Sequence, residues 1–236
     1  MGMPVTATVR DPGFEPSGLD TAFAELRAVD ERFSTYRADS EVARIARGEL
    51  PPQGASPLVR EVLARCEALR NETGGAFDAR AGGALDPSGY VKGWSVQVAS
   101  DRLLEAGAPN HCLNAGGDIR LRGLSTAGRP WRVGVRHPWN PRATCTVIGG
   151  TDLAIATSGV YERGHHVIDP RKGTPARGLR SVTVVGPDLG TADAYATAAI
   201  AMGASGARWV GRRIGYTCAV VTDDGRFLRS PALPVT

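Results

Sequence analysis

An aspartate and a threonine stand four residues apart in an alanine-rich stretch. Asp193 and Thr197 belong to T-A-D-A-Y-A-T-A-A, residues 191–199. Residues at this spacing project from one face of a helix, and a carboxylate beside a hydroxyl suits a hard cation such as Mg²⁺. Helix capping by Thr191, with Asp193 in the first turn, explains the same segment equally well.

A second candidate is L-D-P-S-G-Y-V-K-G-W, residues 85–94, which we interpret as a turn that ends where a helix begins. Lys92 would then lie near backbone N–H groups and the positive end of a helix dipole, which suits a phosphate. A turn with a capping Asp86 and a surface lysine is the alternative. The spacing is not that of a P-loop.

Two glycine-containing segments follow. N-A-G-G-D, residues 114–118, lets the backbone approach a ligand closely, although a Gly-Gly pair is also a plain hairpin turn. Beyond T-S-G-V-Y, residues 157–161, comes G-H-H-V-I-D-P-R, residues 164–171. His166 there could act as a general base near neutral pH, but a histidine pair also occurs in structural turns and accidental metal sites.

Strands and helices must position these segments, and the pattern predicts them in groups. A strand is expected over residues 4–10, helices over 19–33, 57–73 and 94–105, and short strands from 111 to 186. A helix over 191–202, a shorter one over 204–214 and a hairpin over 217–228 follow. Grouped elements predict an α+β fold with a mixed or antiparallel sheet, and with no long linker we expect one domain, residues 1–236.

Composition excludes several classes of protein. The 236 residues are 42% hydrophobic and 22% charged, and the net charge of +4 is spread along the chain. Only 6% aromatic residues and no basic run argue against a nucleic-acid groove. Four dispersed cysteines without metal-ligand spacing predict reduced thiols rather than zinc. Without a signal sequence or an apolar run of ~18 residues, we expect no membrane span and a cytoplasmic location.

Taken together and in order, the four segments resemble the ApbE family, the FAD:protein FMN transferases. The resemblance covers nearly the whole chain. It rests on six or seven motifs in the same order, not on a single one. Besides the segments above, the similar stretches are M-G-M-P-V-T-A-T-V, F-S-T-Y-R-A-D-S-E-V, T-G-G-A-F-D and H-V-I-D-P-R-K-G.

The resemblance implies roles for individual residues. Asp193, Thr197 and the backbone carbonyl of Gly89 would hold Mg²⁺, with Asp193 also counted as catalytic, and His166 would be the base. Tyr36 is a plausible stacking partner for a flat ring. The positions implied to contact FAD are Met1, Tyr36, Ala76, Phe77, Asp78, Asp86, Lys92 and Ile168.

The implied reaction is Mg²⁺-dependent transfer of FMN from FAD to a Thr or Ser hydroxyl of an acceptor flavoprotein, with release of AMP. Hydrolysis of FAD to FMN and AMP and non-catalytic FAD binding are the alternatives. The sequence departs from the family pattern at two places, and the first of them concerns one wall of the FAD pocket. Only six residues separate Asp78 from Leu85, where the family has a longer insertion, and Lys172 stands where threonine is common.

Overall fold

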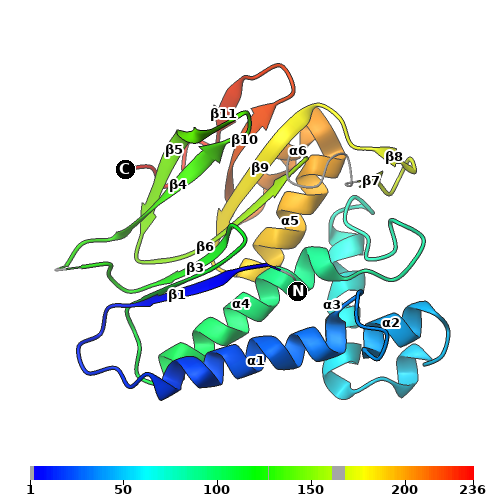
Figure 1. The fold of residues 1–236 in the computed structure, drawn as a ribbon. Coiled ribbons are helices and arrows are strands. Elements are labelled where there is room, and N and C mark those ends of the chain that lie inside the picture. Colours follow the sequence, from blue (N-terminus) through cyan, green and yellow to red (C-terminus); the bar gives the residue numbers. More distant parts are fainter. Residues whose placement is uncertain (1–2, 127, 161–167) are drawn as a thin grey trace.

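A seven-stranded antiparallel sheet forms the centre of the structure. The computed structural model describes residues 3–126, 128–160 and 168–236. The strands follow the order β1-β2-β3-β6-β9-β10-β11, and each runs antiparallel to its neighbours (Figure 1). They are β1 (Val5–Val9), β2 (His111–Ala115), β3 (Asp118–Arg122), β6 (Asp152–Gly159), β9 (Leu179–Gly186), β10 (Thr217–Thr222) and β11 (Phe227–Arg229).

Helices cover one face of this sheet. Their apolar sides pack against the strand side chains that face them and form the main core, with Leu69, Leu103 and Ile200 among its fully buried members. Figure 1 shows α1 and α4 running side by side, with α5 crossing between α4 and the strands. The helices are α1 (Ser17–Phe33), α2 (Glu41–Ala46), α3 (Pro57–Glu72), α4 (Ser88–Glu105), α5 (Leu189–Met202) and α6 (Gly206–Val210).

A long hairpin, β4 and β5, packs on the opposite face of the sheet. Its inward side chains Trp131 and Ile148 meet Ile119 and Leu121 of β3 in a second, smaller core. A very short pair of strands, β7 and β8, follows β6 along the chain. The bounds are β4 (Trp131–His137), β5 (Asn140–Gly150), β7 (Ile168–Asp169) and β8 (Thr174–Pro175).

Strand β3 lies between the two cores, so its side chains sort by alternation. Ile119 and Leu121 enter the smaller core under the hairpin. Asp118 points the other way, toward α4 and α5, and is fully buried there. Because neighbouring side chains of a strand point to opposite faces, the Asp118 carboxylate enters the helix layer.

Helices α4 and α5 approach each other through glycines. A Cβ on Gly93 would collide with the Leu189 carbonyl oxygen and lie 2.8 Å from the Asp193 Cβ, and a Cβ on Gly190 would lie 2.8 Å from the Tyr90 ring. Without side chains at these two crossings, the backbones come close enough for Asp193 to reach α4. The close crossing thus positions the carboxylate of α5 against the first turns of α4.

The α+β class and the antiparallel sheet are confirmed, and most elements lie where the pattern predicts. The predicted start of α4 was wrong. The helix begins at Ser88 and not near Trp94, so Gly89 and Lys92 are helical rather than part of a turn. Two glycines within the first six residues lower helix propensity and obscured this start. The pattern also missed α2 and β8, and the helix expected over 204–214 shortens to α6.

The beginning of α5 decides between the two interpretations of its first turn. Asp188 is the N-cap, and its side chain accepts a hydrogen bond from the Thr191 backbone N–H at 2.7 Å. Thr191 therefore does not cap the helix, and Asp193 has no capping role to explain it. All four cysteines lie in the described part of the chain and are free thiols, as expected. No helix within the described ranges has both the length and the apolarity needed to cross a bilayer.

Candidate active site

Two buried carboxylates and one lysine meet where β3, α4 and α5 come together. The Lys92 Nζ lies 2.8 Å from the Asp118 Oδ2 and 3.9 Å from the Asp193 Oδ1. The Asp193 Oδ2 accepts a hydrogen bond from the Gly93 N–H at 3.0 Å, and the Asp118 Oδ1 accepts one from the Thr157 N–H at 3.3 Å. Both carboxylates are thus held by fixed donors in the protein interior.

Among the residues that the structure describes, the charges in this cluster do not balance. The two carboxyl groups share the Lys92 ammonium and are close enough to affect each other's pKa. Burial raises the pKa of Asp118, and Lys92 opposes the shift. Burial and the neighbouring Asp118 charge raise the pKa of Asp193 well above its usual range. Because two close carboxylates cannot both ionise beside one ammonium at low cost, the pair takes up a proton or a further cation.

Oxygen donors suited to a hard cation line the next turn of α5. The Thr197 Oγ1 lies 3.3 Å from the Ser158 Oγ of β6. A Cβ on Gly89 would lie 3.2 Å from the Thr197 Oγ1 and 3.3 Å from the Phe77 ring, so Gly89 brings backbone against this face of α5. In the described residues no three His, Cys, Asp or Glu side chains gather. A cation here would therefore depend on hydroxyl and carbonyl oxygens as well as carboxylates, a mixture that Mg²⁺ accepts.

Two predicted FAD contacts lie on connected loops beside α4. Asp86 is exposed, and its Oδ1 accepts a hydrogen bond from the Ser88 N–H at 3.0 Å. Its own N–H donates to the Ala79 carbonyl at 2.7 Å, which closes the short connection after Asp78. Asp78 accepts from Arg70 Nε at 3.2 Å. The six-residue connection is therefore a folded loop tied back on itself.

The other predicted FAD contacts differ widely in exposure. Ala76 and Phe77 are buried, Ile168 is half-buried in β7, and Tyr36 is 85% exposed. An exposed ring of this size is free to stack on a planar ligand. Met1 and His166 lie outside the described residues, so their roles stay predictions.

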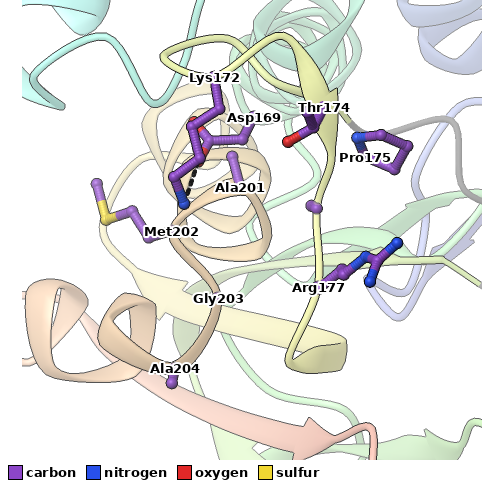
Figure 2. Close-up of a pocket in the computed structure, with 10 residues that line it drawn as sticks. Asp169, Lys172, Thr174, Pro175, Arg177, Ala201, Met202, Gly203 and Ala204 are labelled. Carbon is purple, nitrogen blue, oxygen red and sulfur yellow. Dashed lines mark ion pairs between the residues drawn. The ribbon is translucent and has the colours of Figure 1, made fainter.

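A hollow of about 380 Å³ lies at the C-terminal end of α5. Figure 2 shows Asp169 and Lys172 paired on one side, with Ala201 below them and Arg177 across the opening. The buried Asp169 carboxylate forms ion pairs with Arg171 at 2.8 Å and with Lys172 at 3.3 Å. The Arg171 hydrogen bonds hold the pKa of Asp169 below its usual range, against its burial.

The sequence singled out the N-A-G-G-D segment but not Asp118 as a functional side chain. The signal that could have identified Asp118 is its place as the one carboxylate in an otherwise apolar and basic strand. A carboxylate that is buried there needs a charged or hydrogen-bonding partner. Ser158 was likewise quoted within a motif without a role. Neither partner was visible because Lys92 and Thr197 lie far from them in sequence.

One described histidine can be set aside as the base. His111 is buried, its Nδ1 lies 2.6 Å from the Ala108 carbonyl, and its Nε2 lies 2.7 Å from the Ser100 hydroxyl. Burial lowers its pKa. With both ring nitrogens in use, its role is structural.

Comparison with known proteins identifies the family. The model of the ApbE family matches residues 1–85 and 79–220. A FAD:protein FMN transferase from Vibrio cholerae is 38% identical over 153 residues, which make up 60% of this chain and 46% of that protein. One from Rhodobacter capsulatus is 34% identical over 162 residues, 63% of this chain and 30% of that protein. The chain thus spans less than half the length of these two curated relatives.

Solved structures are similar over a larger share. The flavin transferase ApbE from Vibrio cholerae has a TM-score of 0.84 at 27% identity, covering 98% of this chain and 95% of that one. The ApbE protein from Thermotoga maritima has a TM-score of 0.87 at 24% identity, covering 98% and 94%, and shows the fold alone. With the family model matching over most of its length, this chain belongs to the ApbE family.

Proposed function

We propose that the chain transfers FMN from FAD to a Thr or Ser hydroxyl of an acceptor flavoprotein, with Mg²⁺, and releases AMP. The observation that carries the proposal is the buried Asp118–Asp193 pair, which has one ammonium between its two carboxyl groups. Family membership supplies the substrates, because the relatives named above are FAD:protein FMN transferases.

Three groups would hold the metal: the Asp193 carboxylate, the Thr197 hydroxyl and the Gly89 carbonyl. They fit because Asp193 lacks a full counter-charge and Gly89 packs directly on Thr197. Mg²⁺ bound there would neutralise diphosphate charge and orient the FAD for displacement. The protein's contribution is then chiefly to hold these groups in a fixed geometry.

Lys92 has a second role in this proposal. Its side chain is 25% exposed, so part of it reaches the surface while Asp118 holds the ammonium from the buried side. A fixed ammonium at the first turns of α4, next to the helix dipole, favours a phosphate. Asp118 would thus position Lys92 toward the FAD diphosphate.

The bond changes are those of a phosphoryl transfer. The acceptor oxygen forms a bond to the phosphorus of the FMN half, and the bond from that phosphorus to the bridging oxygen breaks. AMP leaves with the electron pair. The acceptor proton passes to His166, a smaller contribution of ~10²- to 10⁴-fold.

The face of α5 indicates how FAD would lie. Asp193, Thr197 and Ala201 follow one another at intervals of four, so they share one face of the helix. Ala201 also lines the hollow at the helix end, about 12 Å along the axis from Asp193 at ~1.5 Å per residue. An extended dinucleotide can span that distance, with its diphosphate near Lys92 and one end toward the hollow.

The test follows two products. The purified chain is incubated with FAD, Mg²⁺ and a candidate acceptor protein, and AMP release is measured beside covalent flavin fluorescence on a denaturing gel. AMP together with a fluorescent acceptor supports the transferase. AMP without label supports FAD hydrolysis, and tight FAD binding without AMP supports a binding protein; either outcome overturns the proposal.

A further inference from the structure

The turn of the β4–β5 hairpin presents a tryptophan in a fixed orientation. Trp139 is 46% exposed. The Arg180 guanidinium carbon lies 5.5 Å from the centre of its ring, and the His137 ring centroid lies 5.7 Å from it. Both distances fall within the ranges of cation–π and aromatic contacts. An exposed indole that is already held loses little conformational entropy when a partner covers it.

Among the described residues, the surface around this turn is basic. Between Asp118 and Asp152 the sequence has six arginines and no Asp or Glu. Arg120 and Arg122 form ion pairs with Asp152. The other four arginines are exposed on the hairpin or on the chain that leads to it: Arg129, Arg132, Arg136 and Arg142. The hairpin thus carries positive charge with no acidic residue of its own.

This surface adjoins the candidate active site through β9 and β6. The Arg180 carbonyl accepts a hydrogen bond from the Val160 N–H at 3.1 Å. Two residues earlier, Ser158 contacts Thr197, a proposed metal ligand. The hairpin covers the face of the sheet away from α4 and α5 (Figure 1), so a partner there would leave the FAD contacts uncovered.

We propose that the hairpin tip, defined as Arg136, His137, Trp139, Arg142 and Arg180, docks an acidic surface of the acceptor protein. The inference rests on the proposed function, because an acceptor hydroxyl must be brought to FAD by contacts outside the FAD site. Charge complementarity identifies the partner's chemistry, and the central indole supplies the apolar anchor that interface centres favour.

A protein fits this tip better than a membrane does. Trp139 is the one large apolar side chain exposed within residues 131–150. Interfacial binding to lipid needs a row of such side chains, whereas a protein interface can centre on one aromatic residue. Anionic lipid is therefore a competing occupant for the experiment to exclude.

The experiment measures kcat and KM for the acceptor with the purified full chain. Trp139→Ala and Arg180→Gln are each expected to raise the acceptor KM about tenfold and leave kcat within about twofold, because docking and not chemistry is lost. Added salt should raise the wild-type KM and affect Arg180→Gln less. FAD binding, measured by flavin fluorescence, should be unchanged in both variants.

Matched controls lie on the opposite face of the molecule. Leu104→Ala removes a side chain of 45% exposure from α4, and Arg27→Gln removes an exposed cation from α1; both should keep the wild-type KM. An unchanged acceptor KM in Trp139→Ala overturns the docking surface. So does Trp139-dependent binding to anionic phosphatidylglycerol vesicles without an effect on labelling. If the wild type itself releases AMP but labels no acceptor, the proposed function fails with it.

Discussion

Helix α5 runs between two buried carboxylate sites with opposite charge balance. Beside its N-terminal half, Asp118 of β3 and Asp193 of α5 have one close cation among the described residues, Lys92. At its C-terminal end, Asp169 has two, Arg171 at 2.8 Å and Lys172 at 3.3 Å. All three carboxylates are almost fully buried, so the exposure of the carboxylates does not distinguish the two sites.

The difference appears in the direction of the pKa shifts. Burial and the neighbouring charge raise the pKa of Asp193, whereas Arg171 lowers the pKa of Asp169. A carboxylate with surplus cations is already satisfied and holds the fold together. A pair short of positive charge is poised to bind a cation, and functional sites are where such imbalance concentrates.

The largest expected effect is that of Asp193→Asn. The amide keeps the shape and can still accept the Gly93 hydrogen bond, but it removes the charge that a metal would use. We expect Mg²⁺-dependent AMP release to fall by at least roughly a hundredfold. Initial rates over a Mg²⁺ titration measure this.

Asp169→Asn is the matched control, since it removes a buried carboxylate from the other end of the same helix. Its Mg²⁺ dependence should stay that of the wild type. Equal losses of Mg²⁺-dependent rate in both variants would contradict the assignment of the metal to the Asp193 end.

Asp118→Asn should have the next largest effect. The variant loses the charge that holds the Lys92 ammonium at 2.8 Å, so Lys92 is free to move onto Asp193 and compete with the metal. We expect apparent Mg²⁺ affinity to weaken by roughly 10- to 100-fold, the range for residues that orient ligands. Thermal unfolding should show little loss of stability, because an uncompensated buried charge also disappears.

A variant that unfolds far below the wild-type Tm would mean that Asp118 serves packing first. Lys92→Met separates the two roles: it should weaken FAD binding, measured by flavin fluorescence, without abolishing the response to Mg²⁺.

The sequence was enough to predict Asp193 and Thr197 because their spacing of four on a helix is a local property. It could not pair Lys92 with Asp118, since that contact depends on how α4 packs against β3. The same limit explains the start of α4, where tertiary packing against α5 outweighs the low helix propensity of Gly89 and Gly93. Local spacing therefore singled out the candidate ligands, whose role at a metal stays a prediction, and long-range packing placed Lys92 beside Asp118 and Asp193.

A smaller effect is expected on stability at the other end of α5. The folded pKa of Asp169 is lowered, so its ion pairs stabilise the protein above the unfolded value of about 3.9 and this contribution is lost as pH falls through the folded pKa. Asp169→Asn should cost about 1–2 kcal/mol near neutral pH. The difference from wild type should shrink below about pH 4.

Urea unfolding at several pH values measures this difference. Asp39→Asn is the control, because its ion pair with Arg37 is exposed and should contribute little at any pH. A loss in Asp169→Asn that is equally large in acid would show that packing, and not the charge, is responsible.

Lys172→Thr is expected to change stability least, because Asp169 keeps its stronger partner. The Arg171 side chain makes two hydrogen bonds to Asp169, at 2.8 and 2.9 Å, whereas the Lys172 side chain is 71% exposed and contacts one oxygen. An exposed ion pair contributes about 0.5 kcal/mol, so Tm should fall only slightly.

Lys172 also lines the hollow at the end of α5 (Figure 2). If FAD reaches that hollow, Lys172→Thr should raise the KM for FAD several-fold at nearly unchanged Tm. Arg171→Ala should instead act mainly by lowering Tm. A variant that alters Tm and leaves the FAD KM untouched would assign Lys172 to the satisfied, structural end of the helix alone.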